Sequence, residues 1–140
     1  MRRSVIVAVL VTLPVLAGVA CEDEGPQGEV FTANLSGTGT TASGTANFTL
    51  IGSNLTYELL VSNIDDATQA HIHAGGAGET GGVMVGLFDG AATGPDFTGV
   101  LAEGTVTVVD SVISRMRNGT AYVNVHTVVN PGGEIRGQIE

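Results

Sequence analysis

Apolar and polar residues alternate along most of the chain from residue 30 to its end. The clearest example is the run Tyr122-Val123-Asn124-Val125-His126. Successive side chains of a strand point to opposite faces of its sheet. Val123 and Val125 are therefore predicted to face a core, while Tyr122, Asn124 and His126 face away from it.

The strand pattern recurs in short segments separated by turns that contain Gly, Asn, Asp or Pro. These segments are residues 30–35, 44–51, 55–62, 68–73, 83–88, 97–101, 104–109, 121–129 and 134–139. A single stretch, residues 112–117, has a helical pattern, with Asp110 or Ser111 as its cap and Asn118-Gly119 as its end. The sequence predicts an all-β protein, a Greek-key-like antiparallel β-sandwich of about eight or nine strands with one short helix.

The first 20 residues have the pattern of a secretory signal peptide. Arg2 and Arg3 precede an apolar run at residues 4–20 that ends in small residues. This run is shorter than the stretch of about 20 apolar residues that a comfortable membrane span needs. The pattern predicts export from the cytoplasm.

The residues at the end of this run predict how the protein is attached to a membrane. Gly18-Val19-Ala20-Cys21 resembles the lipobox of bacterial lipoproteins, in which the cysteine becomes the lipidated first residue. The same bond also fits an ordinary small-x-small cleavage site, which would give a secreted soluble protein. We expect a signal peptide at residues 1–20, lipidated Cys21 with an acidic tether at residues 21–29, and one domain at residues 30–140. The anchor implies a membrane as one partner.

The net negative charge of the chain limits which other classes of partner are expected. The whole chain has a formal charge of −9, and losing Arg2 and Arg3 with the signal peptide changes it to −11. The chain has no lysine, and its single cysteine excludes an internal disulfide. An acidic surface repels phosphate backbones, so nucleic acid is not a predicted partner.

The three histidines are the candidate metal-binding residues. His71 and His73 lie two residues apart on a predicted strand and therefore share a face. Together with His126 they could form a metal site, because imidazole suits copper and zinc and three protein ligands leave one coordination position open. The other interpretation is that these histidines hydrogen-bond to loops at one end of the sandwich. The residues alone leave both interpretations open.

The last two strands are predicted to form a hairpin. If Val125 and Ile135 share the core face, Arg136 lies on the same face as His126, because a one-residue slip would bury an unpaired charge. The shortest turn of suitable parity is residues 130–132. Arg136 would then either pair with one of the many acids or guide anions to a metal.

Three motifs give a family resemblance. AHIHAG at residues 70–75, YVNVHT at residues 122–127 and PGGEIRGQ at residues 131–138 together resemble the CHRD domain, which is named for its repeats in chordin. The resemblance covers residues 30–140 and implies a non-enzymatic binding module with an envelope or extracellular protein as partner. A purely structural envelope protein is a further hypothesis.

A second resemblance implies an alternative function. His71, His73, His126 and Arg136 are similar to the copper ligands and the guiding arginine of copper/zinc superoxide dismutase. This chain lacks a bridging histidine, a histidine-rich zinc loop and the structural disulfide of that family. The resemblance therefore implies at most a copper-only site with superoxide dismutase-like activity, in which Arg136 would have the catalytic role, or an ancestral scaffold that has lost its metal.

Overall fold

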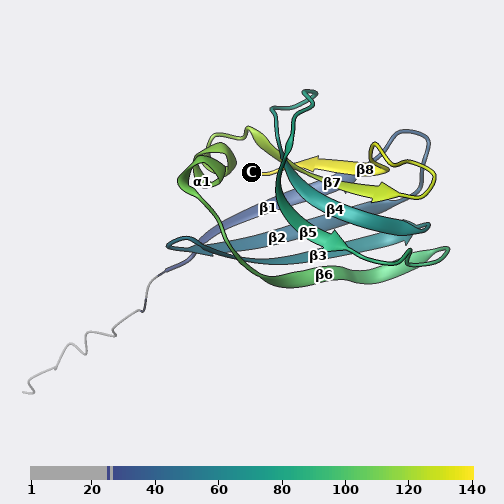
Figure 1. The fold of residues 1–140 in the computed structure, drawn as a ribbon, viewed down its shortest axis with the longest axis horizontal. Coiled ribbons are helices and arrows are strands. Elements are labelled where there is room, and N and C mark those ends of the chain that lie inside the picture. Colours follow the sequence, from purple (N-terminus) through teal and green to yellow (C-terminus); the bar gives the residue numbers. More distant parts are fainter. Residues whose placement is uncertain (1–24, 26) are drawn as a thin grey trace, which may run out of the picture.

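The structure is a computed structural model that describes residue 25 and residues 27–140 (Figure 1). The expected signal peptide and the expected lipidation at Cys21 lie outside the described residues. One helix is present in the described part, α1 (Asp110–Arg117). The strands are β1 (Glu29–Ser36), β2 (Ser43–Ile51), β3 (Asn54–Ile64), β4 (Ala67–Ala74), β5 (Val83–Asp89), β6 (Phe97–Thr107), β7 (Ala121–Thr127) and β8 (Ile135–Gln138).

All eight strands belong to one antiparallel sheet in the order β5-β4-β7-β8-β1-β2-β3-β6. We call β5-β4-β7-β8 the histidine half and β1-β2-β3-β6 the open half. The two halves are joined where β1 pairs with β8, with Ser36 opposite Arg136. Figure 1 shows the two halves as layers that enclose the core. The all-β antiparallel prediction with one short helix is confirmed, and the two layers are parts of one nearly closed sheet.

Aliphatic side chains from both halves fill the space between the layers. Period-two alternation is clearest in β1, where Phe31, Ala33 and Leu35 are buried between exposed neighbours. The largest fully buried side chains are Phe48, Leu55, Leu59, Ile64, Ile72, Met116, Ile135 and Ile139. Helix α1 contributes to this core through Val112, Ile113 and Met116.

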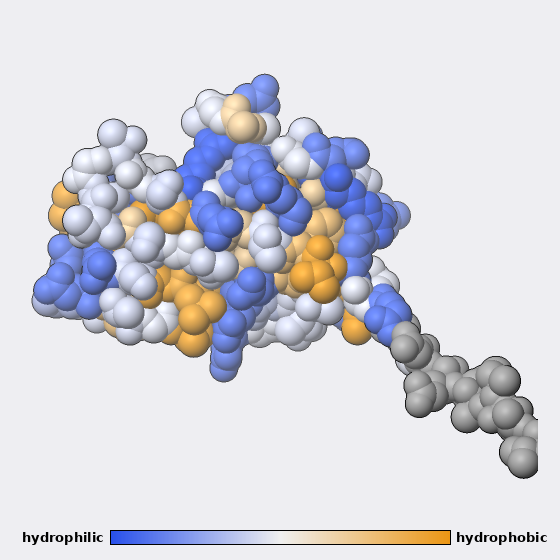
Figure 2. All heavy atoms as spheres, turned by 180° about the vertical axis from the view of Figure 1, so that it is seen from behind, coloured by the Kyte–Doolittle hydropathy of each residue, from blue (hydrophilic) through white to orange (hydrophobic). Residues whose placement is uncertain are grey.

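Apolar residues outside the core are scattered. The exposed large ones include Val30, Ile51, Leu60 and Val100. Figure 2, which views the molecule from the side opposite to Figure 1, shows apolar surface as separate patches between polar ones. Scattered exposed apolar residues of this kind are common on protein surfaces. Within the described residues, no helix has the length and apolar character needed to cross a membrane.

Two details of the predicted elements were wrong. The two strands expected at residues 97–101 and 104–109 are one strand, β6, which ends at Thr107, because a bulge opposite Leu59 and Leu60 absorbs the break in alternation. Helix α1 has Val109 as its N-cap residue without a side-chain cap, so neither Asp110 nor Ser111 caps it. Its predicted end is correct, since Gly119 has φ +63°, a conformation that glycine adopts without strain.

The last hairpin has the predicted faces but a wider turn. Val125 pairs with Ile135 and Asn124 with Arg136, so Arg136 does lie on the face of His126. The predicted turn at residues 130–132 was wrong, because the connection spans residues 128–134. Thr127 Oγ1 accepts a hydrogen bond from the Asn130 amide at 2.9 Å, and this contact draws the loop back over β7.

Candidate metal site

Strand β7 is buried on both of its faces. All seven of its residues are buried, although alternation directs Tyr122, Asn124 and His126 away from the core. Two loops cover these outward side chains: the β4–β5 loop, residues 75–82, and the β7–β8 loop, residues 128–134. The outward face of β7 is therefore a second buried region, lined by polar side chains.

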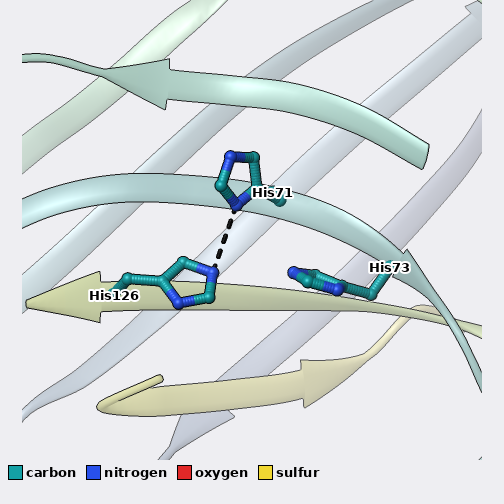
Figure 3. A group of neighbouring side chains, drawn as sticks. All are labelled: His71, His73 and His126. Atoms are coloured by element: carbon teal, nitrogen blue, oxygen red, sulfur yellow. Dashed lines mark hydrogen bonds between the residues drawn. The ribbon is translucent and has the colours of Figure 1, made fainter. Parts of the chain in front are cut away.

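The three imidazoles meet under this cover. The pairing of β4 with β7 places His71 opposite Asn124 and His73 opposite Tyr122, while His126 pairs with Gln69. One ring nitrogen from each histidine lies within 4.8 Å of the other two, and His71 Nδ1 is 3.1 Å from His126 Nε2. Figure 3 shows the three rings gathered over β4 and β7. The predicted convergence of His126 on the pair is confirmed.

Loop carbonyls fix two of the imidazole tautomers. His73 Nδ1 lies 3.0 Å from the carbonyl oxygen of Gly81, and His126 Nδ1 lies 2.9 Å from that of Pro131. A carbonyl can only accept a hydrogen bond, so each Nδ1 must carry the proton. His73 Nε2 keeps a free lone pair, whereas the lone pair of His126 Nε2 accepts a hydrogen bond from His71 Nδ1, a bond that a shared metal ion would replace. Metal-ligating histidines are held by the same kind of contact, in which the second ring nitrogen donates to a carbonyl.

His73 Nε2 has no hydrogen-bond partner. It is one of two buried side-chain polar atoms without a partner among the described residues, and His73 is 8% exposed. A buried polar atom left unpaired costs about 1–3 kcal/mol. The contact of His71 with His126 satisfies those two rings but leaves this lone pair facing the cluster, where a metal ion would pair with it.

The three nitrogens lie near the spacing that one transition metal ion requires. Bonds of about 2.0–2.1 Å hold two ligands of a tetrahedral ion about 3.4 Å apart. His71 Nδ1 and His126 Nε2, at 3.1 Å, are close to this separation, and the three ligand atoms all lie within 4.8 Å of one another. A shared ion therefore requires the rings to approach by up to about 1.4 Å. Three neutral imidazoles suit copper and zinc, and they leave one coordination position free.

Electrostatics favours the neutral form of His71. Burial lowers the pKa of His71 below its usual range, and repulsion from His126 and His73 lowers it further. The carboxylate of Asp89 opposes this shift. Neutral imidazole is the form that binds metal ions, so the surroundings of His71 favour the binding-competent state.

Arg136 stabilises the cover of the site. Its guanidinium donates to the carbonyl oxygen of Glu79 and, at 2.9 Å, to that of Gly76, both in the β4–β5 loop. The guanidinium carbon lies 3.4 Å from the centre of the Tyr122 ring. That ring stacks on His73 with centres 5.1 Å apart and planes 11° apart. Arg136 forms no ion pair in the described part of the chain, so the expected pairing with an acid was wrong, and its guidance of anions stays a prediction.

The sequence profile of the CHRD domain matches residues 27–139. This chain belongs to the CHRD domain family. Chordin of Xenopus laevis is 35% identical over 94 residues, which cover 61% of this chain and 9% of chordin. No solved structure matches the chain significantly. The CHRD domain described here thus spans a small part of the curated relative that it matches.

The motifs that carry the family resemblance lie together in this CHRD domain. AHIHAG supplies His71 and His73, YVNVHT supplies Tyr122 and His126, and GEIRGQ supplies Arg136. The order β4-β7-β8 makes the three motifs neighbours in the sheet. They share one outward face, which is the face covered by the two loops.

Several residues that organise the CHRD domain site were not predicted from the sequence. Gln138 Nε2 donates to the carbonyl oxygens of Gly75, Gly119 and Ala121. Asn124 Nδ2 donates to the carbonyl oxygen of Gly132 at 3.0 Å. The available signal was the position of Asn124 and Gln138 on the outward face, but the sequence does not reveal which loop carbonyls cover that face.

Proposed function

We propose that this CHRD domain is an extracytoplasmic, non-enzymatic binding module that holds a single copper or zinc ion on His71, His73 and His126. The observation that carries the proposal is the buried, unpaired Nε2 of His73 beside two further imidazole nitrogens. The loop carbonyls that hold Nδ1 of His73 and His126 support it, because they direct the Nε2 atom of both rings toward the cluster.

Metal titration of the purified domain tests this proposal. Cu²⁺ and Zn²⁺ are added to metal-free protein, and bound ion is measured by calorimetry and by elemental analysis. We expect one ion per chain in the wild type and loss of that ion in His73→Leu. The control is Asn47→Ala, an exposed residue of the open half, which should bind like the wild type. Absence of stoichiometric binding in correctly folded wild-type protein would sink the proposal.

The location outside the cytoplasm rests on residues 1–21. The proposal includes a lipid anchor on Cys21, with membrane as the partner at that end and an envelope or extracellular protein as partner of the domain. Mass spectrometry of protein extracted from membranes should find acyl chains on an N-terminal Cys21. An unmodified cysteine on freely soluble protein would instead support the secreted alternative.

The non-enzymatic character is supported by the position of Arg136. In a superoxide dismutase-like site this guanidinium would guide anions to the metal, whereas here it donates to Glu79 and Gly76 carbonyl oxygens. Those contacts give it a role in holding the β4–β5 loop. Assay of superoxide dismutation by the copper-loaded domain tests this part, and turnover well above that of free copper would favour the enzymatic alternative.

A further inference from the structure

The histidine cluster is closed on three sides and open on the fourth. The β4–β5 loop closes it beside His73 through Gly81, and the β7–β8 loop closes it beside His126 through Pro131. The buried strand β7 forms the third side. On the fourth side lies β5, an edge strand of the sheet that pairs with His71 and His73.

Strand β5 presents open space at the residue that faces the cluster. Gly86 pairs with His71, is exposed, and has no atom within 4 Å of the position where a Cβ would stand. Its φ lies outside the left-handed region, so backbone conformation does not require glycine there. The next residue along this edge that faces the cluster is Val83, which pairs with His73 and is 57% exposed. Neither residue offers a metal ligand.

His71 itself borders this opening. It is less buried than His73 and His126, which are each 8% exposed. Figure 3 shows its ring above the other two, toward the strand that runs along the top of the view. An ion held by all three rings would therefore be covered from the loop sides and reachable past His71.

No further acid completes the coordination sphere among the described residues. The group whose ligand atoms lie together consists of the three histidines alone. Glu79, the acid of the covering loop, is engaged in that loop, where its Oε2 accepts a hydrogen bond from the Gly76 amide at 2.9 Å. A three-ligand site without a fourth protein donor is the arrangement of sites that exchange ligands, and closed four-ligand sites are structural.

We infer that the bound ion keeps one coordination position open on the β5 side, above Gly86, and that this position takes a small exogenous donor such as water, hydroxide or a small anion. The inference rests on the proposed metal binding and adds where the free position lies and what it takes. Gly86 determines access, because a large side chain there would occupy the space next to His71.

Azide binding to the Cu²⁺-loaded protein tests the open position. Azide is a small anion whose binding to Cu²⁺ produces a new absorption band and a changed electron paramagnetic resonance spectrum. We expect a saturable change in the wild type. In Gly86→Phe, copper stoichiometry should be retained while azide affinity falls by about tenfold or more, because the added ring overlaps the entry. Val100→Phe is the control, since it adds the same ring to an exposed position of the open half.

The outcomes separate this inference from the proposed function. If the wild type binds no copper, the proposed function fails. If copper binds stoichiometrically but azide changes neither spectrum, the open position is overturned and metal binding stands. If azide binds equally well to the wild type and to Gly86→Phe, the location on the β5 side is overturned. Gly86→Leu serves as the second variant should the phenylalanine variant not fold.

Discussion

The outward faces of the two halves differ in what covers them. In the open half, alternation places polar residues outward and they remain at the surface, as with Asn47 and Thr56. In the histidine half, the same alternation places Tyr122, Asn124 and His126 outward, yet all three are buried. One sheet thus carries a solvated polar face and a buried polar face.

Because of this difference, the polar side chains of the histidine half depend on partners within the protein. A polar side chain at the surface is solvated by water, whereas a buried one must find a partner in the protein. Each outward side chain of β7 has found one in a loop: Gly81 N–H donates to Tyr122 Oη, and Asn124 and His126 donate to loop carbonyls. In the open half, the corresponding outward polar side chains remain exposed to solvent.

The largest difference in metal affinity between variants of the two halves should come from substituting one of the three histidines. His126→Ala deletes one of three metal donors and is expected to weaken metal binding by more than about 100-fold, beyond the effect of changing a group that only orients a ligand. Thr105→Ala, on the exposed face of the open half, should leave affinity unchanged. Competition with a chelator of known affinity measures both. Equal affinities in the two variants would remove the functional distinction between the halves.

Loss of the Arg136 contacts should have the next largest effect. Arg136→Met removes the hydrogen bonds to the β4–β5 loop that carries Gly81, the acceptor for His73, so metal affinity is expected to fall about 10–100-fold. Arg117→Met is the matched control, because Arg117 pairs with Glu29 at the surface and has no contact with the covering loops among its described bonds. Retained affinity in Arg136→Met would show that the cover does not orient the ligands.

Adding a side chain to Gly133, in the covering β7–β8 loop, should destabilise the domain. At Gly133, φ is +124° and an added Cβ would stand 2.2 Å from Asn124 Oδ1. Gly133→Ala is therefore expected to destabilise the domain by about 1–3 kcal/mol. Gly86→Ala, which meets nothing within 4 Å, should have little effect. Chemical denaturation of both variants measures the difference, and similar midpoints would contradict the tight packing of the β7–β8 loop.

The smallest expected effect is a pH dependence of stability. The folded state lowers the pKa of His71, chiefly by burial, so the unfolded chain binds this proton more readily. The free energy of unfolding should then decrease as pH falls from about 6.5, the ordinary histidine value, through the lower folded pKa. Denaturation of metal-free protein at pH 7.5 and 5 measures this change. His71→Asn should show a smaller decrease than the wild type, and an equal decrease would assign the effect to other groups.

The sequence predicted the parts of this molecule that depend on alternation. Val123 and Val125 face the core, His71 and His73 share a face, and Arg136 lies on the side of His126, because strand periodicity determines each placement. The convergence of His126 on the pair came from the family resemblance, since sequence distance says nothing about which strands become neighbours.

The cover of the site could not be predicted, because it depends on backbone atoms of loops. The turn after β7 was expected to be tight, but Thr127 and His126 bind the backbone of Asn130 and Pro131 and fold a longer loop over the strand. The same applies to Arg136, for which acids were the expected partners and carbonyls are the actual ones. The sequence gives the type and charge of each side chain. It does not give the positions of the loop carbonyl and amide groups that these side chains bind.

The incomplete closure of the sheet has a consequence for kinetics. Strands β5 and β6 end the strand order and are not hydrogen-bonded to each other, while Tyr57 Oη of β3 donates to the carbonyl oxygen of Leu87 in β5 at 3.1 Å. Strand β5 can therefore detach by breaking its ladder with β4, the Tyr57 hydrogen bond and the core contacts of Val85 and Leu87, while the β4–β7 ladder that carries the histidines stays intact. Amide hydrogens of β5 should exchange with solvent faster than those of β7. For the proposed metal ion, excursions of β5 would then set the rates of entry and exit, separately from the affinity that the three rings would set.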